Sequence, residues 1–124
     1  MAQSQFRSTR KVSGKKYVNV RKKRQCDLGG VPAHTQIGSN KEKIKRVMGG
    51  NQKKSLLRTE FVLVNDGAKV EKLAIKSVEN NPANIHYTRR NVITKGAVVS
   101  TEKGDVAITS RPGQSGSLFG KFVK

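Results

Sequence analysis

Carboxylates, cysteines and aromatic side chains are scarce in this 124-residue chain. Its single cysteine, Cys26, excludes a disulfide within the chain, and no group of Cys and His residues has the spacing of a zinc site. No acidic cluster is available to hold a divalent metal ion. No apolar run approaches the roughly 20 residues of a membrane-spanning helix, and the first residues lack the apolar segment of a signal peptide. We therefore expect a soluble, cytoplasmic protein without cofactor, metal, membrane or small-molecule substrate.

Candidates for catalysis are also few. His34 and His86 are far apart in the sequence, and neither fits a catalytic triad or a metal-binding pattern. The C-terminal Gly120-Lys121 pair is reminiscent of a P-loop, but Phe122 stands where a P-loop has the Ser or Thr that binds magnesium. The sequence therefore predicts that the protein is not an enzyme.

Positive charge, in contrast, is abundant. The chain has 26 Lys and Arg against 8 Asp and Glu, a formal net charge of +18. Residues 1–58 hold 16 of these cations and only 2 anions, Asp27 and Glu42, whereas the remaining residues hold 10 cations and 6 anions. A field of this size attracts polyanions and binds phosphate backbones, so the predicted partner is a nucleic acid.

Residues 1–41 are predicted to form an extended basic arm that binds RNA. Phe6, Tyr17 and Leu28 are its only large apolar side chains without β-branching, too few to offset the entropy lost when the backbone is ordered. Such an arm is expected to be disordered alone and to fold along phosphate-lined grooves of RNA. Its predicted RNA-binding residues are the clustered cations Arg7, Arg10, Lys11, Lys15, Lys16, Arg21, Lys22, Lys23 and Arg24.

A glycine turn connects the arm to the rest of the chain. Gly49-Gly50-Asn51 indicates a turn, because Gly and Asn tolerate positive φ. The preceding residues 39–48 fit either a helix, with Ser39 and Glu42 as its capping box, or a strand. We favour the strand, because the residues after the turn are suited to pair with it. The resulting hairpin, residues 46–58, is predicted to bind RNA through Arg46, Gly49, Gly50, Asn51, Lys53, Lys54 and Arg58.

Residues 42–124 are predicted to form a mainly β domain, a small antiparallel barrel or sandwich. Leu57, Thr59, Phe61 and Leu63 alternate along one face of a strand that ends at the turn signal Asn65-Asp66-Gly67. Further short strands are expected at residues 70–78, 85–87, 92–94, 97–101 and 106–109. The last residues, 119–123, are expected to pack back onto the domain.

Three blocks of the sequence resemble the ribosomal protein S8e family of the archaeal and eukaryotic small subunit. They are Arg7-Ser8-Thr9-Arg10-Lys11-x-Ser13-Gly14, Pro32-Ala33-x-Thr35-x-Ile37-Gly38 and Gly49-Gly50-Asn51-x-Lys53-x-x-x-Leu57-Arg58. Lys15 and Met48 depart from the glycine and arginine that the family often has there. The resemblance implies a structural constituent of the small ribosomal subunit, of the short archaeal form, that binds ribosomal RNA and lies among neighbouring ribosomal proteins. The alternative is a free-standing nucleic-acid-binding accessory or packaging protein.

Overall fold

The computed structural model describes residues 4, 7–65, 67 and 69–123. The chain separates into two units, Met1–Pro32 and Ala33–Lys124. This division precedes the predicted boundary at residue 41, because the Thr35 hydroxyl donates a 2.6 Å hydrogen bond to the Leu56 carbonyl. Strand β1 (Gln36–Ile37) also pairs with strand β3 (Gln52–Thr59). The functional division of the chain at residue 41 stays a prediction.

The N-terminal unit has little regular structure. Its one helical element among the described residues is the 3₁₀ turn η1 (Gln25–Asp27), and none of its described residues is buried. A short hairpin turn forms around Gly14, which has φ of 79° and donates a 3.0 Å hydrogen bond to the Lys11 carbonyl. The Lys11 amide in turn bonds the Lys15 carbonyl at 2.9 Å. Phe6, one of the three large apolar residues of the predicted arm, lies outside the described residues.

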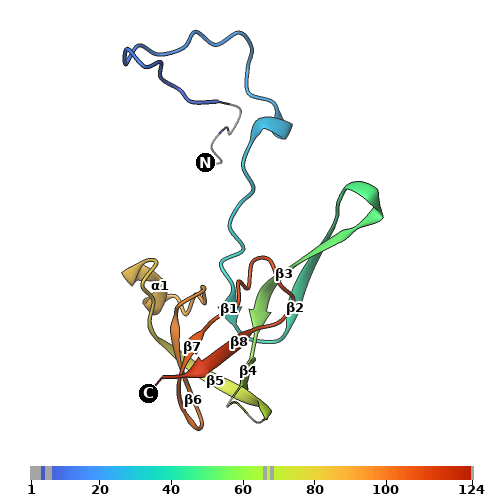
Figure 1. The fold of residues 1–124 in the computed structure, drawn as a ribbon, viewed down its shortest axis with the longest axis vertical. Coiled ribbons are helices and arrows are strands. Elements are labelled where there is room, and N and C mark those ends of the chain that lie inside the picture. Colours follow the sequence, from blue (N-terminus) through green and yellow to red (C-terminus); the bar gives the residue numbers. More distant parts are fainter. Residues whose placement is uncertain (1–3, 5–6, 66, 68, 124) are drawn as a thin grey trace. The chain divides into compact units, whose positions relative to one another are not determined.

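The second unit contains a three-stranded sheet and a closed five-stranded barrel (Figure 1). The sheet has the order β1-β3-β2, with β2 at Lys41–Arg46. The barrel is formed by β4 (Phe61–Asn65), β5 (Val70–Asn80), β6 (Val98–Thr101), β7 (Gly104–Ile108) and β8 (Phe119–Phe122). All its neighbouring strands are antiparallel except β4 and β8, whose parallel pairing closes the barrel. The predicted mainly β, barrel-like fold is confirmed.

β-Branched side chains dominate the barrel core. Val62 and Val64 of β4 are fully buried, and they pack with residues of every other barrel strand or its flanks. The core also includes Leu73, Ile75, Val78, Ile93, Ala97, Val99, Val106, Ile108 and Leu118. Side chains alternate between the two faces of a strand, so Phe61 and Leu63 lie on the outside of the barrel.

The prediction of one continuous face through Leu57, Thr59, Phe61 and Leu63 is therefore wrong. β3 ends at Thr59, and β4 begins at Phe61 in a different sheet. Thr59 is buried while Phe61 is 40% exposed. The break at Glu60 separates the two strands, and the regular alternation of apolar residues conceals it.

The predicted strand at residues 85–87 is also wrong, because these residues belong to the helix α1 (Ile85–Arg89). Asn84 caps it by accepting a 2.9 Å hydrogen bond from the His86 amide, a local interaction that favours helix over strand. The predicted strand at residues 92–94 is reduced to a single bridge between Gln36 and Val92.

The strand prediction for residues 39–48 and the glycine turn are confirmed. β2 and β3 pair antiparallel and are joined by a tight turn at η2 (Met48–Gly50), which does not have helical backbone angles throughout. Gly49 and Gly50 have φ of 74° and 75°, a backbone conformation that side chains with a Cβ rarely adopt. The turn between β4 and β5 is stabilised by a 2.9 Å hydrogen bond from the Gly67 amide to Asn65 Oδ1. Asp66 of that predicted turn lies outside the described residues.

Candidate nucleic-acid interface

The β2–β3 ribbon, residues 41–59, presents lysines on one of its faces without a carboxylate. The pairing register places Lys45 directly opposite Lys53, and Lys43 opposite Ser55. Because alternate side chains share a face, Lys43, Lys45 and Lys53 lie together. All three are exposed. We call this trio the lysine face.

The loop at residues 112–116 covers the base of the ribbon, and Ser55, opposite Lys43 in the register, donates a hydrogen bond to its Gly113 carbonyl. Leu56 is only 1% exposed, and its amide donates a 2.8 Å hydrogen bond to the Pro112 carbonyl. A Cβ added at Gly116 would lie 3.3 Å from Glu42 Oε2 and from Lys54 Cδ, so the loop around Gly116 packs against these side chains. The base of the ribbon is thus held by the loop, and Figure 1 shows the rest extending away from the barrel.

The predicted ribbon residues are therefore not a single surface. Lys53 belongs to the lysine face, whereas Arg46 and Lys54 alternate onto the face that carries Glu42. Arg58 lies near the base, opposite Lys41 in the register. Gly49, Gly50 and Asn51 form the exposed turn at the tip.

Sequence reasoning missed two members of the lysine face, Lys43 and Lys45. The sequence Lys-Glu-Lys-Ile-Lys-Arg at residues 41–46 has a lysine at every second position. Because every second residue of a strand shares a face, this alternation predicts a row of lysines if the segment is a strand. The face could not be assigned while a helix remained an alternative for residues 39–48. The register across the turn, which sets Lys45 against Lys53, was also unknown.

In the N-terminal unit, the hairpin around Gly14 brings several predicted cations together. Arg10 and Lys16 form an isolated bridge across it, and Arg10 Nη1 donates a 2.8 Å hydrogen bond to the Gly14 carbonyl. Lys11 and Lys15 pair through their backbones beside that bridge. All these side chains are exposed. The turn therefore groups four cations within one short segment.

Tyr17 has cations beside its ring. The Arg7 guanidinium carbon lies 4.5 Å from the centre of the ring, and Arg7 Nη2 also donates a 3.2 Å hydrogen bond to the Val18 carbonyl. Lys11 Nζ lies 5.5 Å from the same ring centre. Cation–π attraction accounts for this clustering. In this structure the phenol thus contacts cations of its own unit.

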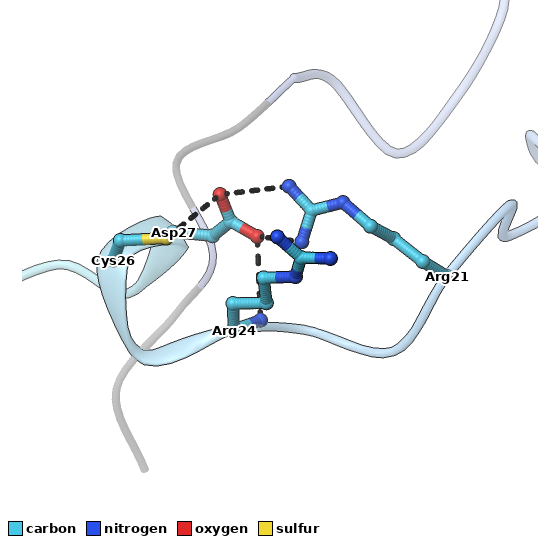
Figure 2. A network of polar contacts seen from close by, with 4 residues as sticks. All are labelled: Arg21, Arg24, Cys26 and Asp27. Atoms are coloured by element: carbon cyan, nitrogen blue, oxygen red, sulfur yellow. Dashed lines mark hydrogen bonds and ion pairs between the residues drawn. The ribbon is translucent and has the colours of Figure 1, made fainter.

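Arg21 has an acidic partner, which Figure 2 shows from close by. Its Nη1 lies 2.7 Å from Asp27 Oδ2, and its Nη2 donates a 3.2 Å hydrogen bond to Oδ1. The hydrogen bond from Arg21 lowers the pKa of the Asp27 carboxyl, and the same bond raises the pKa of Arg21. The carboxylate also accepts a 3.3 Å hydrogen bond from the Arg24 amide and thereby ties η1 to the preceding residues.

The same unit borders an open hollow of about 870 Å³, and six of its thirteen lining residues are cations. Its charged lining residues are Arg7, Arg10, Lys16, Arg21, Lys22, Lys23 and Asp27. Six of the predicted RNA-binding residues therefore converge on one concave surface within the unit.

The candidates for other chemistry are not brought together. Among the described residues, no group of three or more His, Cys, Asp or Glu is placed to hold a metal ion. His34 packs edge-on against Tyr87, with ring centres 5.5 Å apart, whereas His86 lies exposed on α1. No helix in the described part of the chain is long and apolar enough to cross a membrane.

The fold and its charges define a small, strongly basic β-barrel protein with a cationic ribbon and a cationic N-terminal unit. The family model described as ribosomal protein S8e matches residues 4–122. The chain belongs to the ribosomal protein S8e family. Proteins of this family are structural ribosomal components, so both the predicted family and the prediction that the chain is not an enzyme are confirmed.

Three relatives from methanogenic archaea, each named small ribosomal subunit protein eS8, illustrate the similarity. That of Methanospirillum hungatei is 45% identical over 98% of this chain and 99% of its own length. That of Methanocorpusculum labreanum is 47% identical over 97% and 98%. That of Methanococcus aeolicus is 48% identical over 90% of each chain. The similarity thus covers nearly the whole protein.

Proposed function

We propose that this protein is a structural constituent of the small ribosomal subunit that binds ribosomal RNA through two cationic surfaces. One is the lysine face of the β2–β3 ribbon, and the other is the set of predicted cations in the N-terminal unit. Family membership supports the ribosomal role. Neighbouring ribosomal proteins are its expected protein partners.

The observation that carries the proposal is the pairing of Lys45 directly opposite Lys53. Like charges at directly opposed positions of an antiparallel pair destabilise the sheet. Lys43 adds a third ammonium group to the same face, and this face carries no carboxylate to offset them. A phosphate backbone lying along the face would neutralise this repulsion, so the pairing is better suited to a complex with RNA than to the free protein.

The N-terminal cations support the same function in a different way. They lie on exposed backbone that packs around no buried side chain of its own. A segment of this kind adapts its path to the groove that it enters and contributes phosphate contacts, which fix position and carry no sequence information.

The test compares two double variants of equal charge. K45Q/K53Q removes two cations of the lysine face, and K76Q/K95Q removes two exposed cations from the barrel strand β5 and the loop before β6. We expect K45Q/K53Q to lower affinity for small-subunit ribosomal RNA about tenfold or more, and K76Q/K95Q to lower it much less. Equal losses of affinity in the two variants would show that RNA binding depends only on the net charge of the protein. The ribbon would then not be a binding surface.

A second experiment addresses the ribosomal location. The protein should sediment in a one-to-one ratio with the small subunit through gradients at high salt. A free-standing accessory protein would be released under those conditions, because it lacks a fixed set of contacts within the particle.

A further inference from the structure

The outer face of the barrel carries a second surface, separate from the ribbon. Phe61 of β4 and Phe119 of β8 are 40% and 45% exposed. Phe119 is the pairing partner of Leu63 in the parallel β4–β8 register, and Leu63 follows Phe61 by two positions on the same face. The two rings are therefore diagonal neighbours on adjacent strands, which lie side by side in Figure 1.

Two lysines lie beside these rings. Lys72 of β5 pairs with Leu63, and its Nζ lies 4.2 Å from the centre of the Phe61 ring. Lys121 follows Phe119 by two positions on β8 and is exposed. The outward positions of this part of the barrel are Phe61, Leu63, Asn65, Val70, Lys72, Ala74, Phe119 and Lys121. None of these eight is acidic, and Asp105 on the neighbouring strand β7 is diagonal to Lys121 across the β7–β8 pair.

One face of the partly exposed Phe61 ring is covered only by the flexible side chain of Lys72 among the contacts that the structure shows. A cation lies over an aromatic ring because the π face is electron-rich and accessible. The same face can receive a flat aromatic ligand once the flexible lysine side chain moves aside. The ammonium group would then be free to pair with an anionic group of that ligand.

The size of the surface favours a small flat ligand over a protein. At 40% and 45% exposure, the two rings together offer roughly 120–220 Å² of accessible surface. A stable protein–protein interface needs about 800 Å² on each partner. One or two nucleobases fit the smaller area, and aromatic rings beside lysines are the usual platform for unpaired bases.

We propose that Phe61 and Phe119 stack on unpaired RNA bases, while Lys72 and Lys121 pair with the phosphates that join them. This proposal rests on the proposed function, since it assumes that RNA reaches the protein. It adds a site for single-stranded RNA to the phosphate-binding surfaces of the ribbon and the N-terminal unit. The two kinds of site can be distinguished by the salt dependence of RNA affinity, because base stacking is far less sensitive to salt than phosphate pairing.

The test uses the full chain and a single-stranded RNA decamer that contains the fluorescent base 2-aminopurine. Stacking on an aromatic ring quenches this fluorophore. The variant F61L/F119L keeps apolar side chains on the barrel surface but removes both rings. Tyr17→Leu removes the aromatic ring of the N-terminal unit, which also lies beside cations. We expect wild type and Tyr17→Leu to quench the fluorescence, and F61L/F119L to lose the quenching and about fivefold or more in affinity at moderate salt.

Three outcomes would overturn the proposal. The first is undiminished quenching by F61L/F119L, provided that its melting temperature shows a folded barrel. The second is loss of quenching in Tyr17→Leu alone. The third is that the wild type does not quench the fluorescence although it sediments with the small subunit. The two rings would then be expected to contact a neighbouring protein and not RNA. In each of these cases, the effect of K45Q/K53Q on RNA affinity still tests the proposed function separately.

Discussion

Single residues of this protein are best understood through the charge that faces them. Arg21 and Lys53 were both predicted from the sequence as RNA-binding cations, yet their surroundings differ. Arg21 Nη1 lies 2.7 Å from Asp27 Oδ2, whereas Lys53 is paired across the β2–β3 ribbon with Lys45. The sequence cannot distinguish these cases, because the partner of a charged side chain depends on a turn or a strand register. Both stay predicted RNA contacts, but only Lys53 has an environment that favours an added anion.

A first prediction concerns the Arg21–Asp27 pair. The pKa of Asp27 in the folded unit lies below its ordinary value of 3.8, chiefly because of the hydrogen bond from Arg21. The pair thus stabilises η1 fully at pH values above the ordinary carboxyl pKa, and this contribution is lost as the pH falls through the lowered pKa. An NMR titration of the Asp27 carboxyl carbon should give a lowered pKa in the wild type and a higher one in Arg21→Gln. Equal values in the two proteins would mean that the pair does not form in solution.

A second prediction concerns the stability of the lysine face. Replacing Lys53 with Gln removes the repulsion from Lys45, which is worth roughly 0.2–1 kcal/mol before screening by solvent. Amides of β2 and β3 should therefore exchange with solvent more slowly in Lys53→Gln than in the wild type at low salt. The difference should shrink as salt screens the charges. Lys76→Gln, which removes a cation from β5, is the control and should leave ribbon exchange unchanged. Faster exchange in Lys53→Gln would show that this lysine stabilises the ribbon.

At the scale of elements, the sequence predicted the β-hairpin and most barrel strands, because turn residues and alternation mark them locally. It failed at Glu60 and at residues 85–94. Nothing in the alternation between Leu57 and Leu63 reveals that the chain passes from one sheet to another. α1 has only five residues, too short for its periodicity to be recognised. The parallel β4–β8 pair, which closes the barrel, joins strands far apart in the sequence and has no local signal.

The closure of the barrel leads to a third prediction, at Gly120. A Cβ added there would lie 2.4 Å from Val106 Cγ1 and 3.0 Å from the Ala107 carbonyl. Gly120→Ala should therefore destabilise the barrel by roughly 1–3 kcal/mol through overpacking, and lower its melting temperature. The matched control is Gly30→Ala, since an added Cβ at Gly30 meets nothing within 4 Å.

A double-mutant cycle identifies the cause. Val106→Ala removes the atom nearest to the added methyl group, so Gly120→Ala should cost less in that background than in the wild type. Equal costs in both backgrounds would mean that Gly120 is required for a reason other than its contact with Val106.

At the scale of the whole molecule, charge and apolar residues are segregated along the chain. The first 58 residues have a net charge of +14, while the core lies almost wholly after them. The barrel thus folds on its own apolar residues. Among the described cations, Arg21 and Lys103 pair with Asp27 and Glu71. Arg7 and Arg10 donate hydrogen bonds to backbone carbonyls, and Arg7, Lys11 and Lys72 contact aromatic rings. This arrangement suits a protein whose affinity comes mainly from phosphates. Composition alone predicted this segregation of charge. The structure was needed to show which cationic side chains lie together.

The last prediction follows from that segregation. If RNA binding neutralises about 6–10 phosphates, affinity should fall by about 10³–10⁵ between 50 and 200 mM salt, because each neutralised phosphate releases condensed counterions. Filter binding of the full chain to small-subunit ribosomal RNA over this range gives the slope of log affinity against log salt. K45Q/K53Q should make the slope shallower by about two, because two phosphate contacts are lost, whereas F61L/F119L should lower affinity at every salt concentration and leave the slope unchanged. A shallow slope in the wild type would show that contacts other than phosphate pairing dominate, and the cationic surfaces would then need a different explanation.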